Sequence, residues 1–347
     1  MSKMKLLALV VVGAVLMLVA AQCAPVPTPE KVVETVVVTK EVEKEVVVTK
    51  EVEVPAEAEA RFTIGVMMNS AQHPYITAML ASIRSECESL NLECVEQDAR
   101  FDAALQANQV EDLIARGVDG ILFFPVDVGT VRPMLEKIKA AGIPVVSYGN
   151  RVLDEDLDLV NAVTGEDSYF EGQQVARLIA RDFEGKAAKV VVIEGFAGGW
   201  VATNRSKGFE DEIAKLAPDI QILAKQPADW NRANALKIME DFLTRFPDIN
   251  AVYAHDDDMA IGALQAITAA GLVGEVRVYG IGGMGEFLDV LKTGEVHGSV
   301  WQSPVDFGVL PVRTINDILV GRNVQKFQYV DMPQIDANNV DEFTPEW

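Results

Sequence analysis

The stretch AVYAHDDDMAIGALQA, residues 251–266, predicts a strand, a polar turn and a helix in direct succession. Its first four residues are apolar, residues 255–258 are polar, and apolar residues then recur at helical spacing from Met259 to Ile267. In open α/β sheets, ligands bind beyond the carboxyl ends of the strands. Aspartate is also a favoured residue at a helix N-terminus. We therefore expect this turn to carry both a ligand contact and a helix cap.

Segments with strand and helix periodicity alternate on both sides of this turn. The first series has expected strands at 62–68, 92–96, 119–123, 144–148 and 159–163, and expected helices at 75–90, 103–116 and 130–141. The second has expected helices at 169–181, 204–215, 231–246, 285–292 and 307–320, and expected strands at 189–194, 220–224, 276–281 and 296–301, before an irregular tail. This alternation indicates an α/β fold with mostly parallel sheets. Two series of similar size predict two lobes with a cleft between them.

The composition limits the classes of function. The chain has 347 residues, enough for two cores, and a formal net charge of -22 at pH 7. Nucleic-acid binding needs a basic surface, so this charge argues against a nucleic-acid partner. Three cysteines and three histidines are too few and too scattered for a zinc framework. The aspartates at 256–258 lack the alternating spacing of a Ca²⁺ loop, so we expect no metal and no cofactor.

Residues 1–22 have the pattern of a secretory signal peptide, with Lys3 and Lys5 before an apolar run at 6–21. This run is somewhat short for a membrane-spanning helix. Residues 20–23, AAQC, resemble a bacterial lipoprotein cleavage box, in which Cys23 becomes the lipid-modified first residue. Gln22 departs from that box, which usually has Gly, Ala or Ser there. We expect export and a lipid anchor at Cys23, with a retained transmembrane anchor as the alternative.

Residues 23–60 are predicted to form an extended tether between the anchor and the folded part. They contain VVVTK twice, at 36–40 and 46–50, within a repeat of Val, Glu and Lys that has no aromatic residue. The density of β-branched residues disfavours a helix. A β-hairpin packed on the folded part is the alternative.

Seven longer stretches match the pattern of a known family in order. They are IGVMMNSAQHPYITAML from Ile64, RGVDGILFFPVD from Arg116, AAGIPVVSYGNR from Ala140, FAGGWVATNRSKGFEDEI from Phe196, AKQPADWNRANALKIMEDFL from Ala224, INAVYAHDDDMAIGALQAI from Ile249 and VHGSVWQSPVDFG from Val296. Taken together, they resemble the sugar-binding branch of the type I periplasmic solute-binding proteins. The resemblance covers residues 61–330. It implies two doubly wound parallel-sheet lobes joined by a three-stranded hinge, with crossings near 165, 301–302 and 325–327. The N-terminal lobe would then comprise 61–165 and 302–327, and the C-terminal lobe 166–301 and 328–347.

The resemblance also assigns residues to a ligand cleft between the lobes. Tyr75 and Trp230 would supply aromatic walls from opposite lobes, and Asp256 would supply a polar ligand contact. A sugar needs flat apolar surfaces for its C–H faces and polar groups for its hydroxyls. The other positions that match ligand contacts are His73, Ile76, Thr203 and Gln302.

Some positions in this cleft depart from the family pattern. Gly282 stands where a sugar-binding carboxylate is usual, and Phe124 replaces a polar residue. We therefore expect a roomier and more apolar pocket than a ribose site. The segment SYGNR, residues 147–151, matches the family's Asp-Arg pair through Asn150 and Arg151 if one residue is inserted. Without the insertion the match is through Gly149 and Asn150, and the first alternative is favoured.

Other residues near the cleft are expected to have structural roles. Asp257 and Asp258 would cap the helix and hold the turn, and Arg205 would support its own helix. Trp200 would be either a second wall of the cleft or a surface residue. Cys87 and Cys94 flank the first connection from helix to strand, where they would either form a disulfide or stay two buried thiols. The second alternative is favoured.

The predicted function is that of an extracytoplasmic lipoprotein that binds a small sugar or polyol for an ABC importer. The chain would act as a monomer and deliver the ligand to the transporter permease. It would not be an enzyme, because His73, His255 and His297 lie in three different units and no catalytic set can be distinguished. The alternatives are a sensor protein of the same fold that presents its ligand to a membrane receptor, and a binder of a non-sugar solute such as a nucleoside.

Overall fold

The structure is a computed structural model that describes residues 62–347. The predicted signal peptide at 1–22, the predicted lipid modification of Cys23 and the predicted tether at 23–60 fall on residues outside the described part. Within 62–347, no helix combines the length and the apolar character that a membrane crossing needs.

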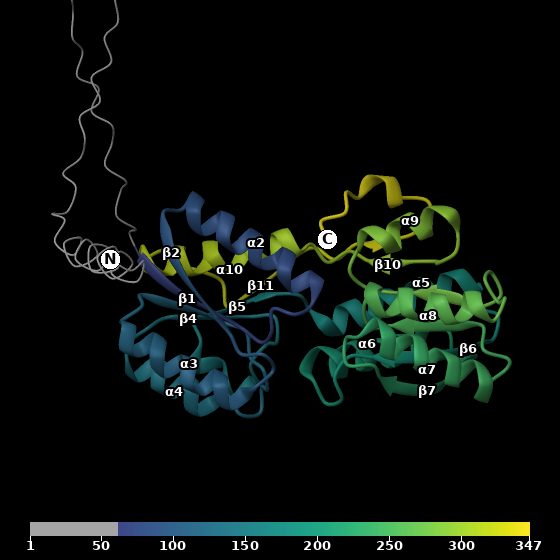
Figure 1. Ribbon diagram of the computed structural model, residues 1–347, viewed down its shortest axis with the longest axis horizontal. Coiled ribbons are helices and arrows are strands. Elements are labelled where there is room, and N and C mark those ends of the chain that lie inside the picture. The colour runs from purple at the N-terminus through teal and green to yellow at the C-terminus, as the bar shows by residue number, and fades with distance from the viewer. Residues whose placement is uncertain (1–61) are drawn as a thin grey trace, which may run out of the picture. The chain divides into compact units, whose positions relative to one another are not determined.

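The first lobe is built on a six-stranded parallel sheet in the order β11-β5-β4-β3-β1-β2. Its strands are β1 (Phe62–Met68), β2 (Leu92–Asp98), β3 (Gly120–Phe123), β4 (Val145–Tyr148), β5 (Ala162–Gly165) and β11 (Phe327–Tyr329). Its helices are α2 (Pro74–Ser89), α3 (Ala103–Arg116), α4 (Arg132–Ala140) and α10 (Pro304–Leu319). One face packs against α2 and α10 and the other against α3 and α4, which makes the sheet doubly wound (Figure 1).

The second lobe is built on a four-stranded parallel sheet in the order β7-β6-β8-β9. Its strands are β6 (Ala188–Glu194), β7 (Ile220–Pro227), β8 (Ala251–Ala254) and β9 (Arg277–Tyr279). Its helices are α5 (Ser168–Phe183), α6 (Trp200–Leu216), α7 (Arg232–Arg245), α8 (Asp257–Ala269) and α9 (Gly285–Thr293). The core on one face takes side chains from α5 and α6, and that on the other from α7, α8 and α9. The predicted α/β fold with two parallel sheets is confirmed.

Local sequence explains where many of these elements begin and end. The side chain of Asp102 accepts hydrogen bonds from the amides of Ala104 and Leu105 at the start of α3, and Gly117 ends that helix with φ +71°. Close packing of α5 on α6 depends on two glycines. A Cβ at Gly172 would lie 2.1 Å from a backbone oxygen of α6, and one at Gly208 would lie 1.9 Å from a backbone oxygen of α5.

The described chain passes between the lobes at three places. It leaves β5 for α5, leaves β10 (Ser299–Val300) for α10, and leaves β11 for β12 (Gln334–Ile335), which pairs with β10. The third passage follows Tyr329, beyond the expected 325–327, because β11 is still paired with β5 in the first sheet. The segment after residue 320, which we expected to be irregular, contains the two short strands β11 and β12. A 3-10 helix, η1 (Asp154–Leu159), also replaces the start of the strand predicted at 159–163.

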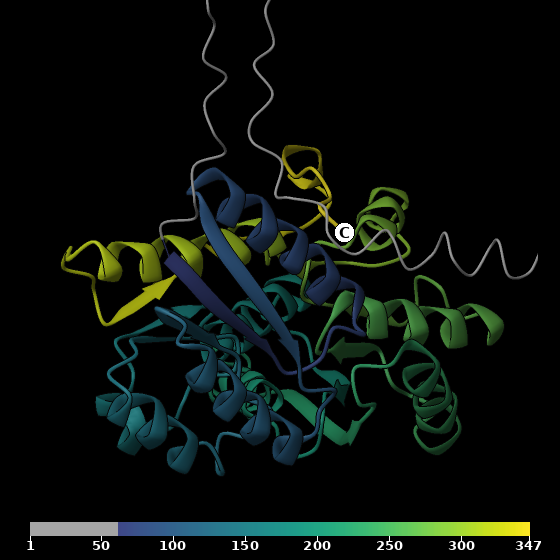
Figure 2. The same ribbon diagram turned by 60° about the vertical axis from the view of Figure 1, so that its left-hand side comes forward.

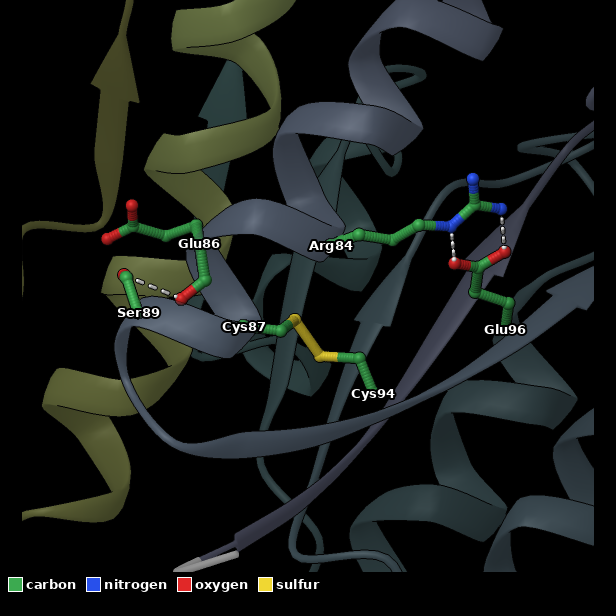
Figure 3. The surroundings of a disulfide bond; sticks show 6 residues. All are labelled: Arg84, Glu86, Cys87, Ser89, Cys94 and Glu96. Carbon is green, nitrogen blue, oxygen red and sulfur yellow. Dashed lines mark hydrogen bonds and ion pairs between the residues drawn. A yellow bond between two sulfur atoms is a disulfide. The ribbon is translucent and has the colours of Figure 1, made fainter.

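Cys87 and Cys94 form a disulfide, so the favoured prediction of two buried thiols is wrong. The bond joins the last turn of α2 to β2, with the Cα atoms 6.3 Å apart (Figure 3). The connection turns sharply at residues 90–91 and brings the two side chains within bridging distance, which their separation in the sequence does not reveal. On the same helix, Arg84 donates to both carboxylate oxygens of Glu96 at 2.5 and 2.7 Å.

Candidate functional site

A cavity of about 480 Å³ lies where the strands of both lobes end. Turns that follow β1 to β5 supply one side, and turns that follow β6 to β9 supply the other. The predicted binding residues that line the cavity are His73, Tyr75, Ile76, Phe124, Asn150, Trp230, Asp256 and Gln302. Parallel sheets bring these residues together because all their strands end on the same side.

Arg151, Thr203 and Gly282 are not among the described residues that line the cavity. The Arg151 guanidinium binds the Asp154 carboxylate instead and lies 5.7 Å from the Trp200 ring. Thr203 is exposed on α6. In this structure these three predicted positions thus lie outside the lining of the cavity. Of the segment SYGNR, Asn150 is the residue that lines it.

Gly282 is covered by another side chain, which explains why it does not reach the cavity. A Cβ built at Gly282 would lie 2.6 Å from Cζ2 of Trp347. The indole Nε1 of Trp347 donates to the Gly282 carbonyl at 3.4 Å. The Trp347 indole therefore fills the extra room that we expected at this position. The cavity as a whole is rich in aromatic side chains.

The three consecutive aspartates differ from the prediction in one respect, the residue that caps α8. Asp256 is the N-cap of α8, and its Oδ1 accepts from the amide of Met259 at 2.7 Å. Asp257 is fully buried and accepts from two amides at 283–284 and from the Ser299 hydroxyl. Asp258 pairs with Arg232 at 2.8 Å. The residue that faces the cavity is thus also the helix cap, and its two neighbours hold the surrounding structure.

His73 and Asp256 meet across the cavity from opposite lobes. Nε2 of His73 lies 3.4 Å from Oδ2 of Asp256. Nδ1 of His73 accepts from the amide of Tyr75 at 3.2 Å and so caps α2, which leaves the proton of a neutral imidazole on Nε2, facing Asp256. Burial lowers the pKa of His73, but the contact with Asp256 and its charge outweigh burial, and the pKa is raised above its ordinary value.

Trp230 is held in an unusual backbone conformation next to the cavity. Its φ is +55° and that of Asp229 is +57°, values that cost non-glycine residues roughly 1–3 kcal/mol each. The ring packs on Gly195, where a Cβ would lie 2.0 Å from Cζ2. The Arg205 guanidinium lies 5.7 Å from the ring on its own lobe. The fold therefore fixes this indole in one orientation.

Arg205 and Glu166 line the cavity, although sequence reasoning gave neither a ligand role. Arg205 is buried and donates to Glu171 at 2.8 Å, so its charge is already paired. Glu166 follows β5 directly, and its Oε2 is buried without a hydrogen-bond partner in the described chain. Burial raises the pKa of Glu166, as does the charge of Glu171, while Arg205 opposes them. The position of this polar residue three residues after the strand predicted at 159–163 was the signal that could have pointed to Glu166.

Aromatic residues that the prediction did not assign, together with Trp200, whose role it left open, complete the cavity. Phe101 and Phe196 face each other from opposite lobes, with ring centroids 4.8 Å apart at 70°. Trp200 also lines the cavity, which agrees with the first of its two predicted roles. Phe307 and Trp347 line it as well. Trp347 lies in the segment expected to be irregular, where no periodicity could have identified it.

Comparisons with known proteins agree with this architecture. A model of the periplasmic binding protein domain matches residues 64–323. The ribose import binding protein of Bacillus subtilis is 34% identical over 265 residues, which are 76% of this chain and 84% of that protein. The xylitol-binding protein of Mycolicibacterium smegmatis is 34% identical over 268 residues, 77% of this chain and 75% of that protein. The crystal structure of a galactofuranose binding protein has a TM-score of 0.77 at 27% identity and covers 81% of this chain and 96% of that one. The chain therefore belongs to the periplasmic binding protein domain family, a family of solute-binding rather than catalytic proteins.

Proposed function

We propose that this protein binds a small sugar or polyol, of pentose or hexose size, in the cavity between its lobes. The observation that carries the proposal is the pairing of aromatic walls with buried polar atoms that lack partners. Tyr75 and Trp230 line the cavity from opposite lobes. The Tyr75 hydroxyl and Oε2 of Glu166 have no hydrogen-bond partner within residues 62–347. An unpaired buried polar atom costs about 1–3 kcal/mol, so a ligand with hydroxyl groups would relieve that penalty.

The relatives support this class of ligand. Besides the ribose and xylitol proteins, a D-allose-binding periplasmic protein of Escherichia coli is 30% identical over 264 residues. Sugars and polyols of this size combine apolar C–H faces with hydroxyls, which is the chemistry that the cavity offers. Lobe closure would exclude water from these contacts and strengthen them.

The test is a thermal-shift screen followed by calorimetric titration. Ribose, xylitol, D-allose, L-arabinose, glycerol and a set of nucleosides would each be added to the purified chain. We expect at least one sugar or polyol to raise Tm and to bind with micromolar or tighter affinity, about -8 kcal/mol. Stabilisation by nucleosides alone would replace the sugar assignment with the nucleoside alternative, and no stabilisation by any compound would overturn the proposal.

The proposed physiological role is delivery of the ligand to the permease of an ABC importer by a monomer tethered at the outer face of the membrane through Cys23. The signal-peptide pattern at 1–23 and the repeat of Val, Glu and Lys within 23–60 support it. Cross-linking in native membranes, followed by mass spectrometry, tests the partner: a permease supports import, and a chemoreceptor or sensor kinase supports the sensor alternative. Cys23→Ala should release the chain from the membrane fraction if the anchor assignment is correct.

A further inference from the structure

Trp347 enters the cavity from a segment that has no part in either parallel sheet. Its ring meets Tyr75 edge-on, with centroids 5.5 Å apart at 85°, and lies 5.9 Å from the ring of His73. Both partners belong to the start of α2 in the first lobe. Trp347 is half-buried and packs against the hydrophobic cores of both lobes.

The Trp347 indole occupies the space that a side chain at Gly282 would need. Gly282 has φ +144°, a conformation that side chains disfavour, and a Cβ there would come within 2.6 Å of the indole. Within the loop at 280–283, Ile281 lines the cavity, whereas Gly282 brings no side chain to it. At Gly282 the cavity is lined by the aromatic ring of Trp347 instead.

Residues 343–347 are anchored to both lobes. On the second lobe, the backbone oxygen of Trp347 accepts from the amide of Gly285 at the start of α9, at 2.9 Å. Phe343 packs on Trp301, with centroids 5.1 Å apart. On the first lobe, the Glu346 carboxylate accepts from the hydroxyl of Ser303, the N-cap of α10, at 2.6 Å.

Figures 1 and 2 show the end of the chain marked C between α2 of the first lobe and the helix at 285–293, labelled α9 in Figure 1. These contacts make residues 343–347 a strap that spans the cavity at the side of Tyr75.

We propose that Trp347 is a specificity-determining residue of the ligand cavity, held in place by this strap. The inference rests on the proposed sugar or polyol function and deepens it. Trp347 stacks on the apolar face of the ligand beside Tyr75 and closes the cavity over Gly282. It therefore favours compact five-carbon ligands over those with an additional hydroxymethyl group. A large aromatic side chain loses little conformational freedom on binding and often dominates the energy of an interface.

The experiment compares calorimetric affinities for ribose, xylitol and D-allose among four proteins: wild type, Trp347→Ala, Trp347→Phe and Phe246→Leu. Phe246 is the matched control, because it is also a half-buried aromatic packed on the second-lobe core but does not line the cavity. We expect Trp347→Ala to weaken binding of the five-carbon ligands by roughly tenfold and to weaken D-allose less. Trp347→Phe should retain most of the affinity, and Phe246→Leu all of it.

Three results would contradict the role of Trp347 or the proposed function on which it rests. Wild-type affinity and preference in Trp347→Ala would overturn the role of Trp347 while the proposed function stands. An equal loss in Phe246→Leu would show that the effect is general destabilisation, which also overturns it. A wild-type chain that binds none of the three compounds, nor any other sugar or polyol, would overturn the proposed function and this inference with it. If Trp347→Ala does not fold, Trp347→Leu replaces it, with the same expected loss.

Discussion

Nε2 of His73 lies 3.4 Å from Oδ2 of Asp256, and this contact joins the N-cap of α2 in the first lobe to the N-cap of α8 in the second. Each residue therefore caps the N-terminus of one helix and contacts the opposite lobe. The pair therefore places a titratable contact between the lobes, beside the cavity that both residues line.

Asp256→Asn should lower the pKa of His73. The raised pKa means that the protonated imidazole contributes stability below its ordinary pKa of 6.5, and this contribution is lost as pH rises through the raised value. With the carboxylate gone, burial remains and acts downward, while asparagine still caps α8. NMR titration of the histidines can follow this change. Burial lowers the pKa of both His255 and His297, so the raised pKa of His73 in the wild type distinguishes it from them. An unchanged His73 titration would contradict the assignment.

Trp230→Ala should weaken binding of the best ligand from the screen by at least tenfold, about 1.4 kcal/mol. Gly195→Ala is a second, indirect test. The added Cβ would force the Trp230 indole out of position, although residue 195 itself does not line the cavity. Calorimetry should show a loss in both variants. Full affinity in Trp230→Ala would remove Trp230 from the site, and full affinity in Gly195→Ala alone would show that the ring can shift without losing the ligand.

Glu166→Gln and Glu166→Ala should differ in their effect on binding. The raised pKa of Glu166 favours its protonated form, and glutamine reproduces the shape and hydrogen-bonding capacity of that form. At pH 6 we expect Glu166→Gln to stay within about threefold of wild-type affinity and Glu166→Ala to lose roughly tenfold, because it removes a buried contact. Titrations of both variants at one pH suffice, and an alanine variant that binds like wild type would falsify this role.

Asp257→Asn should flatten the pH dependence of stability. Burial raises the pKa of Asp257 from its ordinary 3.8 to about 7, although three hydrogen bonds act in the opposite direction. Between these values the folded state binds a proton that the unfolded state does not, so this carboxyl makes stability fall as pH rises from about 4 to 7. Tm measured across that window should have a smaller slope in Asp257→Asn. Asp258→Asn, whose carboxylate pairs with Arg232 near the surface, should keep the wild-type slope.

Reduction of the disulfide between Cys87 and Cys94 should lower Tm by a few degrees. The bond closes a short loop, with a sequence separation of 7, for which chain entropy accounts for on the order of 2 kcal/mol. The double variant Cys87→Ser with Cys94→Ser should show the same decrease and no further decrease on addition of reductant. Mass spectrometry of the untreated protein should find two hydrogens fewer than the reduced form.

The sequence by itself determined the alternation of elements, the parallel sheets and many of the cavity residues. Local signals sufficed for the elements and the sheets, since apolar periodicity sets strands and helices, and parallel strands end on the same side of their sheet. The cavity residues came mainly from the resemblance to a known family. His73, Tyr75 and Trp230 were assigned to the cleft through the family resemblance, and Asp256 also through its place after a predicted strand; all four line the cavity.

Tertiary structure alone decided which neighbour each side chain meets. Arg151 turns to Asp154, Asp256 rather than its neighbours caps α8, and Cys87 reaches Cys94. Trp347 is the clearest case, because its segment has no periodic pattern, and it lies 65 residues along the chain from Gly282. Long-range packing brings it over a glycine that offers no side chain, and no local pattern in the sequence encodes that contact.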